Sequence, residues 1–329
     1  MEKVSFGKND WLFLDHDANN VMAQHRGELP MTEDMLKRWG EVWDRRWQTF
    51  SGHAYFLIVP DPQSIFPECL PFPPVSVRPV HQLLDALKSR PISSQVIYPE
   101  AELLAEKARG HLPVYTQSDT HWTAYGAFIG YRALMDVVRR KHPNVRVLTE
   151  ADIAFTRYDR IGDLGNKLSP MRSSSFARCT VTAPQSHEAF NNGMRVRGSF
   201  QLYENTDRSL ARCVLFGTSY SYPMISILKE SFSTVVFCHR AAIDEDIIGK
   251  VKPDVVLFEM AERFINRVPI DSLAPTHNAV VLEKLGSMSK EERAGLAEKL
   301  NQIQVEDETL ACYFQQKHFE LISTVQQET

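Results

Sequence analysis

Several features that would assign the chain to a common class of protein are missing. It has five cysteines in 329 residues, none of them at the C-x-x-C spacing of zinc or redox sites. An odd, scattered set of cysteines also argues against a disulfide framework. No apolar stretch is long enough to span a bilayer. The formal net charge is only −4 and no block of like charges occurs, so a nucleic acid is not an expected partner.

The N-terminal sequence has no basic region followed by an apolar stretch and a small-residue cleavage site, which is the pattern of a secretory signal. Taken as it stands, the sequence predicts a cytoplasmic protein. If the chain is part of a longer one, a location outside the cytoplasm stays open.

Motifs for the commonest metal and nucleotide chemistries are missing as well. The sequence has no H-E-x-x-H motif, no P-loop and no G-x-G-x-x-G between a strand and a helix. We therefore expect no metal and no tightly bound cofactor. His16 stands between two aspartates in a short loop, where an exposed histidine is the simpler interpretation.

Apolar runs alternate with helical periodicity in the first and last thirds of the chain. The pattern predicts strands at 53–59, 95–98, 213–216, 235–238 and 255–258, and helices at 32–50, 80–87, 100–109, 122–141 and 244–251. Such alternation is typical of a parallel sheet flanked by helices, an α/β fold. The tryptophans in the helix that begins after Thr32 recur at three- and four-residue steps, which predicts a core-facing stripe.

Two other stretches have weaker patterns. Residues 145–211 are interpreted as an insertion of loops and short strands, of a length that is often functional. Residues from about 270 to 329 are interpreted as a helical extension, with a capping box at Ser289 and Glu292 and an uncertain tail after Glu306. We expect one domain that spans residues 1–329.

Three short strings carry the candidate chemistry. They are Val59-Pro60-Asp61, Asp119-Thr120-His121-Trp122 and Gly217-Thr218-Ser219-Tyr220-Ser221. Each is predicted to follow an apolar strand, and parallel sheets bind ligands at the carboxyl ends of their strands. The strings therefore predict one site to which an aspartate, a histidine and a serine contribute.

Those three residue types suit nucleophilic catalysis. Ser219 lies at the turn from a strand into a helix, so the backbone N–H groups that follow it can face a developing oxyanion. His121 is the candidate base that takes the proton of the serine. Asp119 can hold the other ring nitrogen of His121 and select its tautomer. Taken singly, the Ser219 string and the Asp119–His121 string each favour a simpler interpretation, a helix cap, with a surface histidine in the second.

Other candidates have two interpretations each. Glu259 and Arg263 stand at helical spacing, so they form an intrahelical ion pair or Arg263 faces the site. Tyr203, Tyr220 and Tyr222 line a sugar site or pack in the core.

At these strings the chain resembles the alginate O-acetyltransferase group, typified by AlgX and AlgJ, of the SGNH-hydrolase superfamily. The resemblance also covers Gly7–Leu14, the proline-rich stretch Val59–Pro71, Gly126-Ala127, Gly162-Asp163-Leu164 and Glu259–Arg263. It implies a flavodoxin-like SGNH sheet that is circularly permuted, with the serine string late in the chain. It also implies a periplasmic location.

The resemblance implies acetyl transfer to a polysaccharide or its precursor through an acetyl-enzyme. Ser219 is then the nucleophile, His121 the base and Asp119 its orienter, and the expected oxyanion-stabilising or substrate-binding residues are Trp122, Tyr220, Ser221, Tyr222 and Arg263. An acetyl donor is required, and a membrane protein that supplies acetyl groups or the polysaccharide synthesis machinery is an expected partner. Two alternatives stay open. One is a carbohydrate O-acetylesterase with the same triad, and the other is a saccharide-binding or assembly protein that does not turn over.

Overall fold

A seven-stranded sheet forms the centre of the computed structural model, which describes residues 3–327. Its spatial order is β4 (Val96–Ile97), β3 (Ala54–Val59), β11 (Val255–Ala261), β9 (Arg212–Gly217), β10 (Thr234–His239), β8 (Phe200–Asn205) and β7 (Ser186–Asn191). The first five strands are parallel, whereas β8 runs antiparallel to β10 and β7 antiparallel to β8. The predicted α/β fold with a mostly parallel sheet is therefore confirmed.

The sheet is buried on both faces. In β3 the side chains of Tyr55, Leu57 and Val59 enter one apolar cluster, while Ala54 and Phe56 enter the other. This two-sided burial explains why the strand reads as a continuous apolar run rather than an alternating one.

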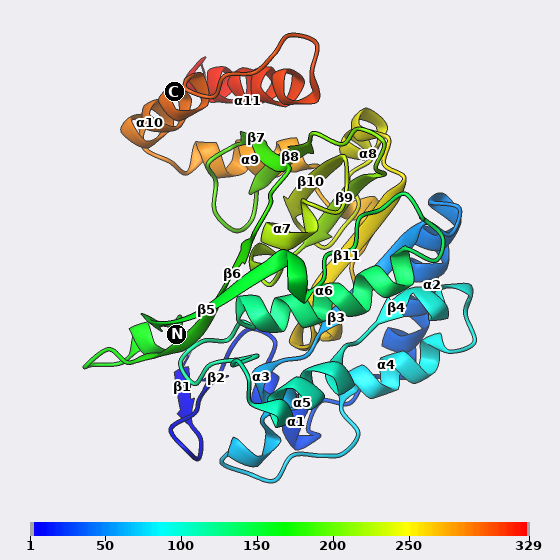
Figure 1. Ribbon diagram of the computed structural model, residues 1–329, viewed down its shortest axis with the longest axis vertical. Helices are drawn as coiled ribbons and strands as arrows, with labels where there is room; N and C mark the ends of the chain where they lie inside the picture. Colours follow the sequence, from blue (N-terminus) through cyan, green and yellow to red (C-terminus); the bar gives the residue numbers. More distant parts are fainter. Residues whose placement is uncertain (1–2, 328–329) are drawn as a thin grey trace.

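Helices cover the two faces (Figure 1). One face is covered by α1 (Val21–Arg26), α5 (Glu100–Arg109), α6 (Ala124–Val138) and α7 (Ser221–Leu228). The other is covered by α2 (Glu33–Thr49), α4 (Pro79–Leu87), α8 (Glu245–Val251), α9 (His277–Gly286), α10 (Lys290–Asn301) and α11 (Leu310–Gln327). The short helix α3 (Pro62–Ile65) follows β3. A hairpin of β1 (Lys3–Phe6) and β2 (Leu12–Asp15) lies near the start of the chain.

Helix α2 carries the predicted tryptophan stripe. Trp39 and Trp43 are fully buried and stack on Phe56 of β3, with ring centroids 5.7 and 4.2 Å from it. The stripe is thus part of the core, as its periodicity indicated.

Helix α6 begins two residues later than predicted and ends three residues earlier. Thr123 caps it by accepting a hydrogen bond from the Gly126 N–H (3.2 Å). Both glycines of its first half permit close packing. A Cβ at Gly126 would lie 2.3 Å from the Val114 carbonyl oxygen, and one at Gly130 would lie 2.4 Å from the Trp122 ring.

The region 145–211 is more regular than predicted. It contains two nine-residue strands, β5 (Ile153–Ile161) and β6 (Ser173–Val181), which pair as an antiparallel ribbon with Tyr158 opposite Phe176. In Figure 1 this ribbon extends away from the central sheet. The same region supplies β7 and β8 to that sheet. Much of the ribbon is exposed, so it has no continuous apolar run to mark it.

One further expectation is corrected. No strand of the sheet leads into Asp119, because residues 110–120 form a loop in which Tyr115 makes a single bridge to Trp122. The hydroxyls of Thr116 and Ser118 in this loop bond to Ser174 of β6 instead of extending a ladder (2.5 Å for Ser118). The stretch after Glu306, whose structure the sequence left open, contains α11, whose Phe314 and Ile322 are buried.

All five cysteines are free. Within residues 3–327, none of the helices combines the length and the apolar character needed to cross a membrane.

Candidate active site

Ser219 lies in the turn between β9 and α7, partly open to solvent. The turn depends on Gly217, because a Cβ there would lie 2.2 Å from Ser221 Oγ and 3.0 Å from Glu259 Oε2. Glycine therefore allows the strand to bend sharply against buried polar groups. The bend places the serine hydroxyl at the carboxyl edge of the parallel sheet.

His121 joins Ser219 to Asp119. Its Nε2 lies 2.8 Å from Ser219 Oγ, and its Nδ1 lies 2.9 Å from Asp119 Oδ1. Asp119 Oδ1 also accepts the His121 backbone N–H at 2.8 Å. A carboxylate at Nδ1 favours the tautomer that carries hydrogen there, which leaves the Nε2 lone pair facing the serine hydroxyl.

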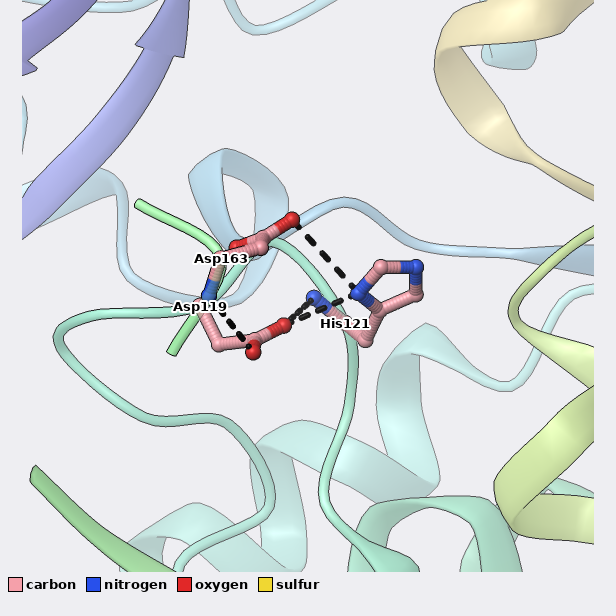
Figure 2. Close-up of side chains that lie close together, drawn as sticks. All are labelled: Asp119, His121 and Asp163. Carbon is pink, nitrogen blue, oxygen red and sulfur yellow. Dashed lines mark hydrogen bonds and ion pairs between the residues drawn. The ribbon is translucent and has the colours of Figure 1, made fainter. Parts of the chain in front are cut away.

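Asp163 is a second carboxylate at this histidine, and the sequence analysis assigned it no role. Its Oδ2 lies 3.7 Å from His121 Nδ1. Its backbone N–H donates to Asp119 Oδ2 at 3.0 Å, so the two aspartates are tied together. Figure 2 shows both carboxylates on the Nδ1 side of the imidazole, with Nε2 directed away from them.

The string Gly162-Asp163-Leu164 supplied the one signal that could have identified this residue. A Cβ at Gly162 would lie 2.1 Å from the Ser118 carbonyl oxygen and 2.8 Å from Asp119 Cβ. The N–H groups of Leu164 and Gly165 both donate to that carbonyl, at 3.0 and 2.9 Å. Glycine is thus needed for this loop to reach the Asp119 loop.

The pKa values of the two carboxylates shift in opposite directions. Burial opposes the charged form of Asp119, but its hydrogen bonds with His121 outweigh burial and lower its pKa. Burial raises the pKa of Asp163, and the negative charge of Asp119 raises it further. Asp119 is therefore the stronger acid of the pair and the one matched to stabilise a protonated His121.

Tyr220 supports the histidine loop from below. Its hydroxyl donates to the Thr120 carbonyl and accepts a hydrogen bond from Arg263 Nη1 (2.7 Å). The Arg263 N–H donates to Asp61 Oδ2 at 2.8 Å, and its guanidinium also pairs with Asp61. Burial raises the pKa of Asp61 despite that pairing. Tyr220 and Arg263 are buried, so their polar groups hydrogen-bond to other residues of the protein rather than face solvent.

Of the two interpretations of Glu259 and Arg263, the intrahelical ion pair is the one that the structure excludes, since Glu259 lies in a strand and Arg263 pairs with Asp61. Strand β11 continues to Ala261, so Glu259 is extended rather than helical and points toward the serine turn. Its Oε2 accepts hydrogen bonds from the Thr218 N–H (2.8 Å) and from Ser221 Oγ (2.6 Å). Burial raises the pKa of Glu259, although these hydrogen bonds oppose the shift.

The N–H groups that follow Ser219 are already engaged. Those of Tyr220 and Ser221 hydrogen-bond to the Thr218 hydroxyl and carbonyl at 3.3 and 3.1 Å. The Ser219 N–H has no partner among the residues described, so it is the donor that this turn leaves for an oxyanion.

A cavity of about 450 Å³ opens on the His121 side of Ser219, and we call it the polar cavity. Trp122 and Tyr222 line it, together with residues of the β5–β6 ribbon. The ribbon contributes Tyr158 and Phe176, with ring centroids 5.9 Å apart, and Arg160 and Arg178, whose guanidinium groups lie over those rings. The structure therefore places Trp122 and Tyr222 at the cavity, whereas Tyr220, Ser221 and Arg263 lie beneath it.

Tyr203, the other aromatic candidate, lies in β8. Its hydroxyl bonds to Glu188 and Gln201 at 3.2 and 3.1 Å, and it lines no cavity next to Ser219.

Asp119, His121 and Asp163 form the one group of potential metal ligands within residues 3–327. The potential ligand atoms are already hydrogen-bonded within the protein. Asp119 and Asp163 each accept a backbone N–H group, and His121 Nδ1 donates to Asp119. We interpret Asp119 and His121 as two members of a hydrogen-bonded chain that ends at Ser219, with Asp163 as a supporting carboxylate.

Comparisons with known proteins place this geometry in a family. Residues 4–238 match the family described as SGNH hydrolase-like domain, acetyltransferase AlgX. No curated protein matches the chain.

Three solved structures share the fold. PatB1 from Bacillus cereus superimposes with a TM-score of 0.60 at 15% identity, covering 80% of this chain and 97% of that one. A DHHW family protein from Eubacterium siraeum gives 0.56 at 13% identity, with 82% and 96% covered. The O-acetyltransferase domain of Pseudomonas putida AlgJ gives 0.51 at 19% identity, with 83% and 96% covered. At identities this low, the TM-scores show a shared fold and nothing beyond it.

Proposed function

The chain belongs to the family of SGNH hydrolase-like acetyltransferases typified by AlgX, and we propose that it is a serine-dependent O-acetyltransferase that acts on a polysaccharide or a saccharide precursor. The observation that carries the proposal is the continuous path from Asp119 through His121 to Ser219, with both contacts of the imidazole within hydrogen-bond distance. A nucleophile, a base and an orienting carboxylate in this order are what acyl transfer requires.

In the first half-reaction, Ser219 Oγ attacks the carbonyl carbon of an acetyl ester or thioester while its proton moves to His121 Nε2. The Ser219 N–H stabilises the oxyanion. The bond from the acetyl carbon to the leaving oxygen or sulfur then breaks, and His121 gives its proton to the leaving group. The product is an ester between the acetyl group and Ser219.

In the second half-reaction, a sugar hydroxyl enters the polar cavity and gives its proton to His121 Nε2 as its oxygen attacks the Ser219 ester. Collapse of the intermediate returns the proton to Ser219 Oγ and releases the acetylated sugar. The aromatic rings of Tyr158, Phe176 and Tyr222 suit stacking against a sugar ring, and Arg160 and Arg178 supply donors for its oxygens. The likeness to an O-acetyltransferase domain, that of AlgJ, supports the same assignment.

Hydrolysis of p-nitrophenyl acetate tests the nucleophile. We expect S219A and H121A to lose at least about 10³-fold in kcat, the loss that follows when one member of such a triad is removed. S175A, at an exposed serine of β6, is the matched control and should retain wild-type turnover. Wild-type turnover by S219A would refute the proposal.

Mass spectrometry separates transfer from hydrolysis. Protein incubated with p-nitrophenyl acetate should carry an acetyl adduct on the peptide that contains Ser219. Addition of uronate and neutral oligosaccharides should then yield acetylated sugar. Release of free acetate alone would favour the esterase. A saccharide-binding protein without turnover would form no adduct.

A further inference from the structure

Ser219 also lines a second cavity, which His121 does not line. It has a volume of about 820 Å³, and we call it the apolar cavity. Gly217, Thr218 and Ser219 form one end of it. Ser219 is the one residue that lines both cavities, while His121 and Asp119 line only the polar cavity. The nucleophile therefore lies at a junction between two spaces of different character.

Most of the wall comes from the chain beyond β10. Its apolar side chains are Val196, Met260, Phe264, Ile270, Leu273 and Val280. Leu273 is 78% exposed, Val196 55% and Ile270 44%, so three of the large apolar side chains most open to solvent gather at this cavity. Apolar groups gathered in this way mark a binding surface for an apolar ligand.

The charged groups of the wall do not favour an anion. Arg197 pairs with Glu283 at 2.8 Å and Arg240 with Asp244 at 2.7 Å. The Arg267 guanidinium donates to the Ala18 carbonyl (2.6 Å). Because these cations are satisfied within the protein, what the cavity offers a ligand next to Ser219 is mainly apolar surface.

The stereochemistry of acyl transfer assigns the two cavities different groups. The leaving group must receive a proton from His121 Nε2, and the acceptor must give one to it, so both lie in the polar cavity. The oxyanion faces the Ser219 N–H. The remaining substituent of the tetrahedral carbon is the carbon chain of the acyl group, which must point away from His121. The apolar cavity, which Ser219 lines and His121 does not, offers a space for that chain.

We propose that the apolar cavity is an acyl-chain site and that the acyl transfer proposed above extends to acyl groups longer than acetyl. The inference rests on the proposed function, because it assumes that Ser219 forms the acyl ester. An acetyl group has one methyl group beyond the carbonyl carbon, far less than a cavity of about 820 Å³ holds. Most of the lining lies after residue 238, where the match to the acetyltransferase family ends, whereas residues 196–198 and 217–219 of the lining lie within the match.

The chemistry balances as in acetyl transfer. An acyl ester or thioester donor gives its acyl carbon to Ser219 Oγ, and the bond to its leaving oxygen or sulfur breaks. The serine proton passes through His121 to that leaving group. The acceptor hydroxyl later replaces Ser219 at the same carbon.

A series of p-nitrophenyl esters from acetate to octanoate tests the proposal. In the wild-type protein, kcat/KM should rise by about fourfold per methylene up to hexanoate, the factor that corresponds to about 0.8 kcal/mol for each buried methylene. With equimolar acetate and hexanoate esters, the adduct on the Ser219 peptide should be mainly hexanoyl.

Two substitutions test whether the acyl chain occupies the apolar cavity. A241W places an indole at an exposed alanine of the cavity wall, and L273D replaces an apolar wall residue by a charge. Each should lower kcat/KM for hexanoate at least tenfold more than for acetate. A101W, at an exposed alanine of α5, is the control and should keep the wild-type ratio.

The outcomes separate this inference from the proposed function. A wild-type kcat/KM that is flat or falls beyond acetate, with turnover still dependent on Ser219, would overturn the acyl-chain site and leave the acetyltransferase standing. An unchanged hexanoate-to-acetate ratio in A241W and L273D would overturn it as well. Turnover that is independent of Ser219 would remove both proposals.

Discussion

Thr120 donates both its backbone N–H and its hydroxyl to Asp163, at 2.7 Å from Oδ1 and 2.5 Å from Oδ2. The residue that precedes His121 is thus held by a carboxylate from a separate loop. The Thr120 carbonyl is held in turn by the Tyr220 hydroxyl, next to Ser219 in the chain. Asp163 is therefore a positioning residue, which fixes the loop that presents the imidazole.

Removal of Asp163 should lower kcat more than it changes KM. In D163A, Thr120 loses both bonds, and we expect a loss of about 10- to 100-fold in kcat, in line with about 1.5–3 kcal/mol for hydrogen bonds to a charged group. D163N keeps an acceptor for the N–H and should recover most of the activity. Steady-state kinetics with p-nitrophenyl acetate give kcat and KM for D163A and D163N. D159N, on the exposed β5–β6 ribbon, is the control. Equal losses in D163N and D163A would show that the charge, not the position, matters.

Glu259 should be required for the stability of the serine turn. E259L leaves the Thr218 N–H and the Ser221 hydroxyl without an acceptor in a buried place, and each such group costs about 1–3 kcal/mol. We expect the free energy of unfolding to fall by about 2–5 kcal/mol in E259L and by less in E259Q. Urea denaturation measures both. E41L, at an exposed helical glutamate, should stay within about 0.5 kcal/mol of wild type. A stable E259L would mean that the turn does not depend on this acceptor.

Gly130 should not tolerate alanine. The new methyl group would meet the Trp122 ring at 2.4 Å, and that ring donates its Nε1–H to the Tyr220 carbonyl at 2.8 Å. We expect G130A to destabilise the protein by about 1–3 kcal/mol and to lower activity, because the displaced ring shifts the chain beside Ser219. G295A in α10 is the matched control, since a Cβ there has open space. It should gain up to about 1 kcal/mol from helix propensity. The same loss in both variants would contradict the steric argument.

His318 should make the protein less stable in acid. The Phe314 carbonyl can only accept, so Nδ1 donates to it (2.7 Å), and Nε2 then accepts from the Asn192 side-chain amide (3.2 Å). Burial lowers the pKa of His318 to about 4, and burial lowers that of the adjacent His277 to about 3. The unfolded chain takes up these protons near pH 6.5. Stability is therefore complete above that pH and falls as the pH drops toward 4, because only the unfolded chain is protonated there.

Urea unfolding at pH 7.5, 6.5, 5.5 and 4.5 measures this dependence. The free energy of unfolding should fall by up to about 1.4 kcal/mol per pH unit for each such histidine. H318Q should flatten the slope, and H187Q, at an exposed histidine, should leave it unchanged. An H318Q slope equal to that of wild type would show that this ring does not carry the effect.

Local signals predicted the elements that depend on local interactions. The continuous apolar run before Pro60 forms β3, and helix α5 spans Glu100–Arg109 as expected. The capping box at Ser289 is present, with the Glu292 N–H donating to its hydroxyl. A helix cap and a strand made of one continuous apolar run both depend on residues that are neighbours in the chain. The sequence was therefore sufficient to predict them. The ribbon of β5 and β6 was missed because its pairing satisfies the backbone while much of its surface stays open to solvent.

The sequence by itself determined which residue types stand at the ends of the apolar runs, and hence that a serine, a histidine and an aspartate were available. Only the tertiary structure decided that His121 bridges Asp119 and Ser219, that Glu259 turns to the serine loop rather than to Arg263, and that Asp163 joins the site. The contacts of His121 with Ser219, of Glu259 with the serine loop and of Asp163 with Asp119 form between segments far apart in the chain. Their geometry depends on how loops approach one another at Gly162 and Gly217. The two cavities at Ser219 have the same origin, since their walls come from a β-ribbon on one side and from the chain after β10 on the other.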